Sequence, residues 1–187
     1  LVMVASTGRI GVPLPMAKIS KGIKAASEAL SRDGGAEAAR AIMTTDTRPK
    51  EIAVTIRVGD ADVTIGGMVK GAGMIAPRLK TLHATMLCFI TTDADVDNRL
   101  LSQLLEECSE LSFNRVTVDG DTSTNDTVIL MANGASGKRI EKRSPDAELF
   151  KKALLIVMEH LAKEMVRDGE GMTKVVSVEV VNARDEE

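Results

Sequence analysis

The chain has 187 residues, of which 44% are apolar and 27% are charged, and its net charge is −3. This length and apolar content suffice for one ordinary domain or two small ones with a sizeable core. The sequence has no basic stripe, no Tyr or Trp and only three Phe, which argues against nucleic acid as a partner.

No apolar run approaches the length of a membrane span, and no signal peptide is recognisable, so we expect no membrane partner. The two cysteines make no disulfide framework, which fits a cytoplasmic location. Cys88 and Cys108 both lie in apolar periodic segments, where they are expected to pack as small hydrophobes rather than form a disulfide. The chain opens on Leu1, inside an apolar run, instead of on Met. We therefore expect an internal piece of a longer protein.

The first half of the chain predicts a strand, two helices and a hairpin. The apolar run at residues 1–5 predicts a buried strand, and apolar spacing after Pro15 predicts a helix over 15–30. A second, short helix is expected at 36–42. Alternation of apolar and polar residues over 52–58, resumed at 63–65 after a glycine-containing turn, predicts a β-hairpin.

The second half predicts further strands and two amphipathic helices. The strands are expected at residues 86–90, 116–118, 128–131 and 175–181. One helix covers 95–108, and a longer one is capped by Ser144, begins at Pro145 and ends before Gly169. Because strands and helices mix and include a hairpin, the fold class is α/β with mixed α and β layers, rather than an all-parallel sheet.

Metal and phosphate sites lack support in the sequence. His83 and His160 are the only histidines, and no His, Cys or carboxylate spacing matches a zinc or iron site. The glycine-rich stretches at 66–73 and 134–139 lack the Gly-Lys-Ser/Thr ending of a P-loop and are interpreted as tight turns. We expect neither a metal nor a cofactor.

Thr85 opens an apolar segment and has two interpretations. It can be a structural residue at a strand edge, where threonine is common. It can also be a nucleophile exposed by self-cleavage, because the freed amine of an N-terminal threonine serves as its own base. The small Ala84 before it, the buried strand after it, and a possible oxyanion hole at Ser6-Thr7-Gly8 meet the requirements of the second interpretation.

Six segments decide between these interpretations by resemblance. The stretches VASTGRIGVPLPM, AIMTTDTRPKE, GGMVKGAGMIAP, HATMLCFITTDA, DGDTSTNDT and RDGEGMTK occur in this order and cover essentially the whole chain. Together they resemble the glutamate N-acetyltransferase family, also called ornithine acetyltransferases, of arginine biosynthesis. The resemblance implies a layered sheet-and-helix fold similar to that of self-processing aminopeptidases. It also implies transfer of acetyl from N2-acetyl-L-ornithine to L-glutamate through an acetyl-threonine, with acetyl-CoA as a second donor in some members.

The resemblance also implies the processing site. Thr85 matches the nucleophile, and the bond between Ala84 and Thr85 matches the cleavage site. Residues 1–187 would then be one catalytic-core fragment, with 1–84 ending the α chain and 85–187 starting the β chain of a heterotetramer. Thr7 and Gly8 match the oxyanion-hole pair. Thr81 is a rival for the nucleophile, because the segment before Thr85 is longer than usual, but the ATML and TTDA flanks align at Thr85.

The substrate-binding residues implied by the family are Thr47, Lys70, Thr85 and Glu170, with Thr44 and Thr45 as close rivals of Thr47. Family members are roughly twice as long as this chain, so an incomplete site is an alternative. A related self-processing amidase or aminopeptidase, with water as the acceptor, is the other alternative.

Overall fold

The computed structural model describes residues 2–9, 11–79 and 85–184. Its main sheet has the strand order β1-β2-β3-β5, with β1 at Lys50–Val58, β2 at Ala61–Lys70, β3 at Leu87–Thr92 and β5 at Thr127–Ala132. Strand β2 is antiparallel to both of its neighbours, β1 and β3, whereas β3 and β5 are parallel. The short strands β4 (Asp95–Val96) and β6 (Arg139–Ile140) form a separate parallel pair. The predicted mixed α/β class is confirmed.

The β1–β2 hairpin follows from the alternation in its sequence. Val58 pairs with Ala61, and the intervening turn begins at Gly59, whose φ of +60° lies in the left-handed region that glycine adopts without strain. Val63 and Ile65 are buried in the core, while Thr64 between them is less buried. The predicted hairpin is therefore confirmed, and its far end brings Lys50 level with Val69.

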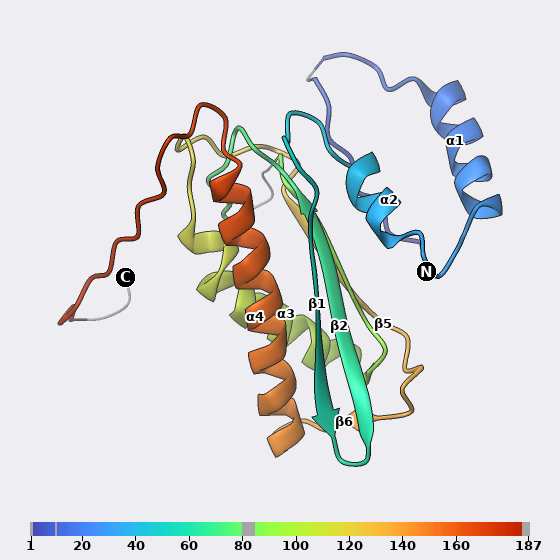
Figure 1. Cartoon of the computed structure of the whole chain (residues 1–187), viewed down its shortest axis with the longest axis vertical. Helices are drawn as coiled ribbons and strands as arrows, with labels where there is room; N and C mark the ends of the chain where they lie inside the picture. Colours follow the sequence, from blue (N-terminus) through green and yellow to red (C-terminus); the bar gives the residue numbers. More distant parts are fainter. Residues whose placement is uncertain (1, 10, 80–84, 185–187) are drawn as a thin grey trace.

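Helices α3 (Asn98–Leu111) and α4 (Pro145–Arg167) pack along one face of the sheet (Figure 1). The Ser144 hydroxyl accepts a hydrogen bond from the Ala147 amide at 3.0 Å, so the predicted cap of α4 is present. The helix approaches β2 so closely that a Cβ atom at Gly67 would lie 3.0 Å from Leu161. The buried side chains of α4 are Ala147, Phe150, Ala153, Leu154, Val157, Met158, Leu161, Ala162 and Met165.

Two predicted helices form on the other side of the sheet, toward one of its ends (Figure 1). Helix α1 spans Met16–Glu28 and buries none of its residues, although its apolar spacing predicted an inward face. Helix α2 spans Gly35–Ala41 and buries Ala39 near β1 and β2. A single 3-10 turn, η1 (Phe113–Arg115), follows α3. No helix within the described ranges is long and apolar enough to cross a membrane.

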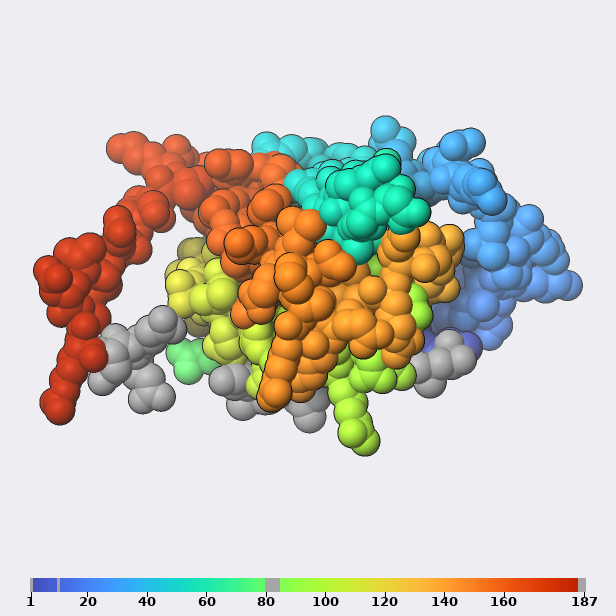
Figure 2. All heavy atoms as spheres, turned by 90° about the horizontal axis from the view of Figure 1, so that it is seen from below, coloured from blue at the N-terminus to red at the C-terminus, as the bar shows by residue number. Residues whose placement is uncertain are grey.

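Three predicted strands are wrong. The described residues 2–5, 116–118 and 175–181 belong to no strand. Their β-branched composition favours extended backbone, but a strand also needs a hydrogen-bonded neighbour, and in the part of the chain described here none of these segments pairs with a sheet. The side chains remain largely exposed at both ends, with Val4 at 84% and Val178 at 82%. Figure 2 shows the N-terminal and C-terminal segments on opposite sides of the molecule.

Candidate active site

A buried polar cluster lies where β1 begins and α4 ends. The Lys50 Nζ atom is 2.6 Å from Asp46 and 2.5 Å from Asp168, and all three residues are at most 8% exposed. Asp168 also accepts a hydrogen bond from the Thr47 hydroxyl and another, at 2.9 Å, from the Thr47 amide. Of the three candidate threonines at 44–47, Thr47 is thus the one whose hydroxyl is bound into this cluster.

The loop after β2 joins this cluster to Lys70. Asp46 accepts a hydrogen bond from the Gly71 amide at 2.7 Å, which fixes the point where Lys70 leaves the strand. Lys70 is only 1% exposed, and the carboxylates that act on its charge are Asp46 and Asp126. A predicted substrate-binding lysine is therefore a buried cation with acidic neighbours from two loops.

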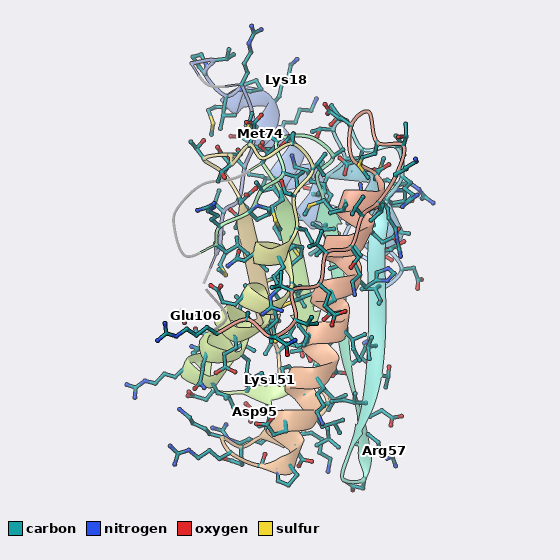
Figure 3. The ribbon with its side chains drawn as sticks, turned by 90° about the vertical axis from the view of Figure 1, so that its left-hand side faces the viewer. Lys18, Arg57, Met74, Asp95, Glu106 and Lys151 are labelled. Atoms are coloured by element: carbon teal, nitrogen blue, oxygen red, sulfur yellow. The ribbon has the colours of Figure 1, made fainter. Side chains whose placement is uncertain are left out.

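Glu170 reaches the same loop from the end of α4. Its amide donates a hydrogen bond to the Ala72 carbonyl at 2.8 Å. A Cβ atom at Gly73 would lie 2.7 Å from the Glu170 Cδ atom, so only glycine leaves room for that carboxylate. The loop continues through Met74, which has a left-handed φ of 56° and whose amide is bound by Asp119. Figure 3 shows Met74 at the end of the molecule opposite the β1–β2 turn, which Arg57 marks.

Thr85 lies two residues before β3. Lys70 is the Cα partner of Leu87 across β2 and β3, so Thr85 is two residues along the chain from the partner of the buried lysine. Thr85 is partly buried. Three residues of the preceding segment lie outside the described residues. They are Ala84 of the proposed cleavage site, Thr81 as the alternative nucleophile, and His83.

A carboxylate that sequence reasoning did not select sits directly beside Thr85. The Asp126 Oδ1 atom accepts a hydrogen bond from the Met86 amide at 2.5 Å, and the Thr85 amide also acts to lower the pKa of Asp126. The neighbouring Asn125 donates from Nδ2 to the Ser6 carbonyl at 2.8 Å. This contact tethers the segment that carries Thr7 and Gly8 to the loop that carries Asp126. Thr7 is partly buried and Gly8 is exposed.

Burial and hydrogen bonding set the protonation of this region. Burial acts to raise the pKa values of Asp46 and Asp168, but hydrogen bonds, including those from Lys50, outweigh it and hold both pKa values below the ordinary range. Burial lowers the pKa of Lys70 against the opposing pull of Asp46 and Asp126. For Asp126, burial dominates and raises the pKa to about 7.

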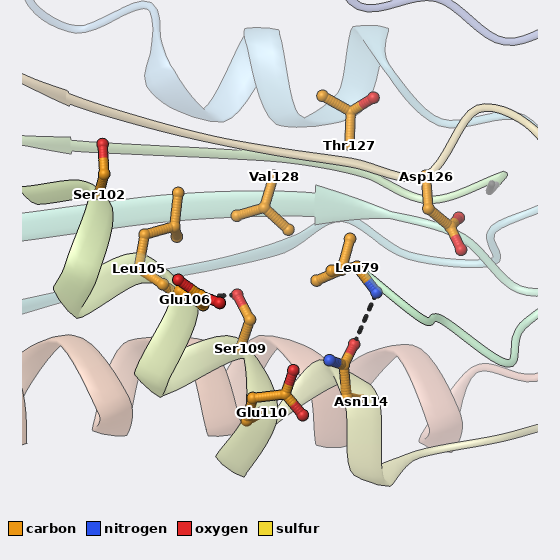
Figure 4. Close-up of a pocket in the computed structure, with 10 residues that line it drawn as sticks. All are labelled: Leu79, Ser102, Leu105, Glu106, Ser109, Glu110, Asn114, Asp126, Thr127 and Val128. Carbon is orange, nitrogen blue, oxygen red and sulfur yellow. Dashed lines mark hydrogen bonds between the residues drawn. The ribbon is translucent and has the colours of Figure 1, made fainter. Parts of the chain in front are cut away.

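Two cavities lie near these elements. One, of about 500 Å³, is bounded by α3, by Leu79 and by the start of β5, and Figure 4 shows Asp126 at one end of it and Ser102 at the other. The second, of about 650 Å³, lies between α4 and the C-terminal segment.

Within the described residues, no group of three or more His, Cys, Asp or Glu could hold a metal ion. Cys88 and Cys108 are both buried and unbridged, as predicted.

The structure thus brings the predicted residues Thr47, Lys70, Thr85 and Glu170 to one end of the sheet, with Thr7 tied in through Ser6. Sequence reasoning missed Asp46, Lys50, Asp126 and Asp168. Each lies inside a segment used for the resemblance, but no local pattern in the sequence singles it out. Their roles depend on contacts between segments far apart in the chain.

Comparison with known proteins decides the relationship. The sequence model of the ArgJ family matches residues 1–187. The chain belongs to the ArgJ family. Among its relatives, the arginine biosynthesis bifunctional protein ArgJ of Symbiobacterium thermophilum is 56% identical over 98% of this chain and 45% of its own length. The glutamate N-acetyltransferase of Methanocaldococcus jannaschii is 50% identical over 100% of this chain and 45% of its own length.

The ArgJ relatives are longer than this chain, which spans about 45% of their length. A crystal structure of ArgJ from Bacillus halodurans is 48% identical, with a TM-score of 0.45 over 46% of this chain and 41% of that one. The family model and the identities of these relatives confirm, at the level of the ArgJ family, the resemblance first drawn from six segments.

Proposed function

We propose that the protein is a self-processing glutamate N-acetyltransferase of arginine biosynthesis, which moves acetyl from N2-acetyl-L-ornithine to L-glutamate. The names of the ArgJ relatives support this activity. The observation that carries it is the convergence of three separate motifs at one end of the sheet. Lys70 is the partner of Leu87, two residues beyond Thr85, and Glu170 packs on Gly73 of the lysine's own loop.

The proposed chemistry begins with cleavage of the Ala84–Thr85 bond, which frees the Thr85 amine. That amine takes the proton of the Thr85 hydroxyl as Oγ1 attacks the acetyl carbonyl carbon of acetylornithine. The Thr7 hydroxyl and the Gly8 amide stabilise the oxyanion. When the C–N bond breaks, the proton passes to the departing ornithine amine, and acetyl remains on Thr85. The glutamate amine then attacks this ester and regenerates Thr85.

The substrate contacts follow from charge. Lys70 is the candidate partner of a glutamate carboxylate, and Glu170 is the candidate partner of the ornithine ammonium group. Thr47 adds a hydroxyl held by Asp168. We further propose that α and β chains from one precursor remain together as a cytoplasmic heterotetramer, and that acetyl-CoA can also donate acetyl to glutamate.

A labelling experiment on the full-length gene product tests this function. Intact mass should show a break before Thr85 without added protease, and incubation with N-acetylornithine alone should add one acetyl group to Thr85. Glutamate should discharge it much faster than water, because a bound amine has an effective concentration that diffusing water lacks. A second arm replaces N-acetylornithine with acetyl-CoA.

Two variants sharpen the labelling experiment. Thr85→Ala should remain uncut and unlabelled. Lys70→Ala should raise the glutamate concentration needed for discharge far more than it slows hydrolysis, and Lys70→Arg should restore little because the guanidinium does not match a compact ammonium in a tight loop. Discharge by water as fast as by saturating glutamate would replace the transferase with the amidase alternative.

A further inference from the structure

Asp126 binds the segment between the proposed cleavage site and β3. The Oδ1 atom accepts a hydrogen bond from the Met86 amide at 2.5 Å, and the Thr85 amide also acts to lower the pKa of this carboxylate. The second oxygen, Oδ2, is buried and has no hydrogen-bond partner in the described part of the chain. The carboxylate that binds the Met86 amide therefore has a second, unused acceptor close to Thr85, the residue before Met86.

That nitrogen is the atom that a break after residue 84 would turn from an amide into an amine. We propose that Asp126 is a positioning residue that holds the α-amino group of Thr85 and orients it toward the Thr85 hydroxyl. This inference rests on the proposed function, because only cleavage creates the amine. It adds to that function a carboxylate that acts through the base rather than on the substrate.

The geometry suits both protonation states of the amine. A neutral amine that donates an N–H to Asp126 has its rotation about the Cα–N bond restricted, so its lone pair can be aimed at the hydroxyl hydrogen. When the hydroxyl proton moves to the amine, the resulting ammonium offers a further N–H, and Oδ2 is there to accept it. Asp126 neither gains nor loses a proton in these steps. The proton taken from the Thr85 hydroxyl passes from the ammonium to the departing amine.

Charged side chains on other elements surround Asp126. Lys70 from β2 is the cation that acts on it, and Glu106 and Glu110 of α3 share the cavity that Asp126 lines. Burial raises the pKa of Asp126 to about 7 in the uncut chain, against the opposing effect of the Met86 and Thr85 amides and of Lys70. An ammonium created beside it supplies the missing compensation and favours the ionised carboxylate.

The test measures the pKa of the Thr85 amine directly in the cleaved full-length protein. The rate at which an amine-specific acylating reagent modifies the first residue of the 85-onward chain is followed against pH by peptide mass spectrometry. Asp126→Asn keeps the shape of the side chain and removes its charge. We expect it to lower the amine pKa by about one to three pH units. The acid limb of the acetyl-transfer profile should move to lower pH by the same amount, with a reduced plateau.

The matched control is Asp93→Asn. Asp93 accepts a strand amide, that of Thr64 at 2.8 Å, but lies just beyond the opposite end of β3. The Asp93→Asn variant should leave the pKa of the Thr85 amine unchanged. If Asp126→Asn stays uncut, a protease site whose cleavage leaves Thr85 as the first residue supplies the amine in both variants.

The outcomes separate this inference from the proposed function. An uncut wild-type protein, or one that never carries acetyl on Thr85, removes the function itself. A cut, acetylated wild type whose amine pKa is the same in Asp126→Asn overturns the role of Asp126 and leaves the function standing. A lowered amine pKa in Asp126→Asn alone, with wild-type behaviour in Asp93→Asn, supports it.

Discussion

Asp168 accepts both the hydroxyl and the amide of Thr47, and so joins the end of α4 to the loop before β1. These two residues are separated by 121 positions in the chain. The same carboxylate binds Lys50, which also binds Asp46. One buried cation thus holds two loops that frame the candidate active site.

Lys50→Met should strongly destabilise the protein, because it leaves Asp46 and Asp168 buried without their cation. Breaking a buried pair in this way typically costs about 3–5 kcal/mol in the free energy of unfolding. Urea unfolding at neutral pH measures it. Arg57→Met removes one partner of the exposed pair with Asp62 and should leave the unfolding midpoint almost unchanged. Equal losses in both variants would contradict the structural role of Lys50.

Gly73→Ala should impair the site without unfolding the protein. The added Cβ would meet the carboxylate end of Glu170, which can swing away at little cost in stability but then leaves its position. Under the proposed function, we expect a raised KM for N-acetylornithine and a near-normal melting temperature. Gly66→Ala is the control, since its Cβ would meet its nearest neighbour at an ordinary 3.8 Å. A KM unchanged by Gly73→Ala would remove Glu170 from the substrate site.

Asp126→Asn should stabilise the uncut chain in a pH-dependent way. The pKa of Asp126 in the folded chain is raised to about 7 from 3.8. The folded state therefore loses stability as the pH rises above 3.8, and this loss is complete above about pH 7. Asparagine carries no such cost. In a Thr85→Ala background, which keeps the amides but blocks the proposed cleavage, the melting temperature of Asp126→Asn should exceed its parent's at pH 8. The two should converge toward pH 4.

Thr7→Ala should slow both self-cleavage and acetyl transfer, because each passes through a tetrahedral oxyanion. Loss of one donor typically costs on the order of 10²–10³ in rate. Thr7→Ser keeps the hydroxyl and should be much milder. Time courses of processing by mass spectrometry and of acetylglutamate formation measure the two effects. Wild-type rates in Thr7→Ala would exclude this hydroxyl from the oxyanion hole.

The sequence predicted those parts of the fold that local patterns determine. Alternation specified the β1–β2 hairpin, and the Ser144 cap with Pro145 specified the start of α4. The segment at 175–181 has equally strong strand composition but does not form a strand, because pairing depends on a neighbour that local pattern cannot supply.

The candidate site divides in a similar way. Thr85, Lys70 and Glu170 were found because each stands in a segment with a recognisable resemblance. The functions of Lys50 and Asp168 depend on an ion pair across 118 positions, and that of Asp126 on a contact with Met86 across 40. Such contacts depend on how strands and helix ends are arranged in three dimensions, and the spacing of these residues in the sequence does not predict them.

The strand order has a consequence for the two halves that a break after residue 84 would produce. Strands β1 and β2 would belong to one piece and β3 and β5 to the other, yet β2 and β3 are joined by a ladder of six residue pairs. The seam between the two polypeptides would run through the middle of a single sheet. Dissociation would therefore be inseparable from unfolding, and the melting temperature of the cut protein, unlike that of the uncut one, should rise with protein concentration.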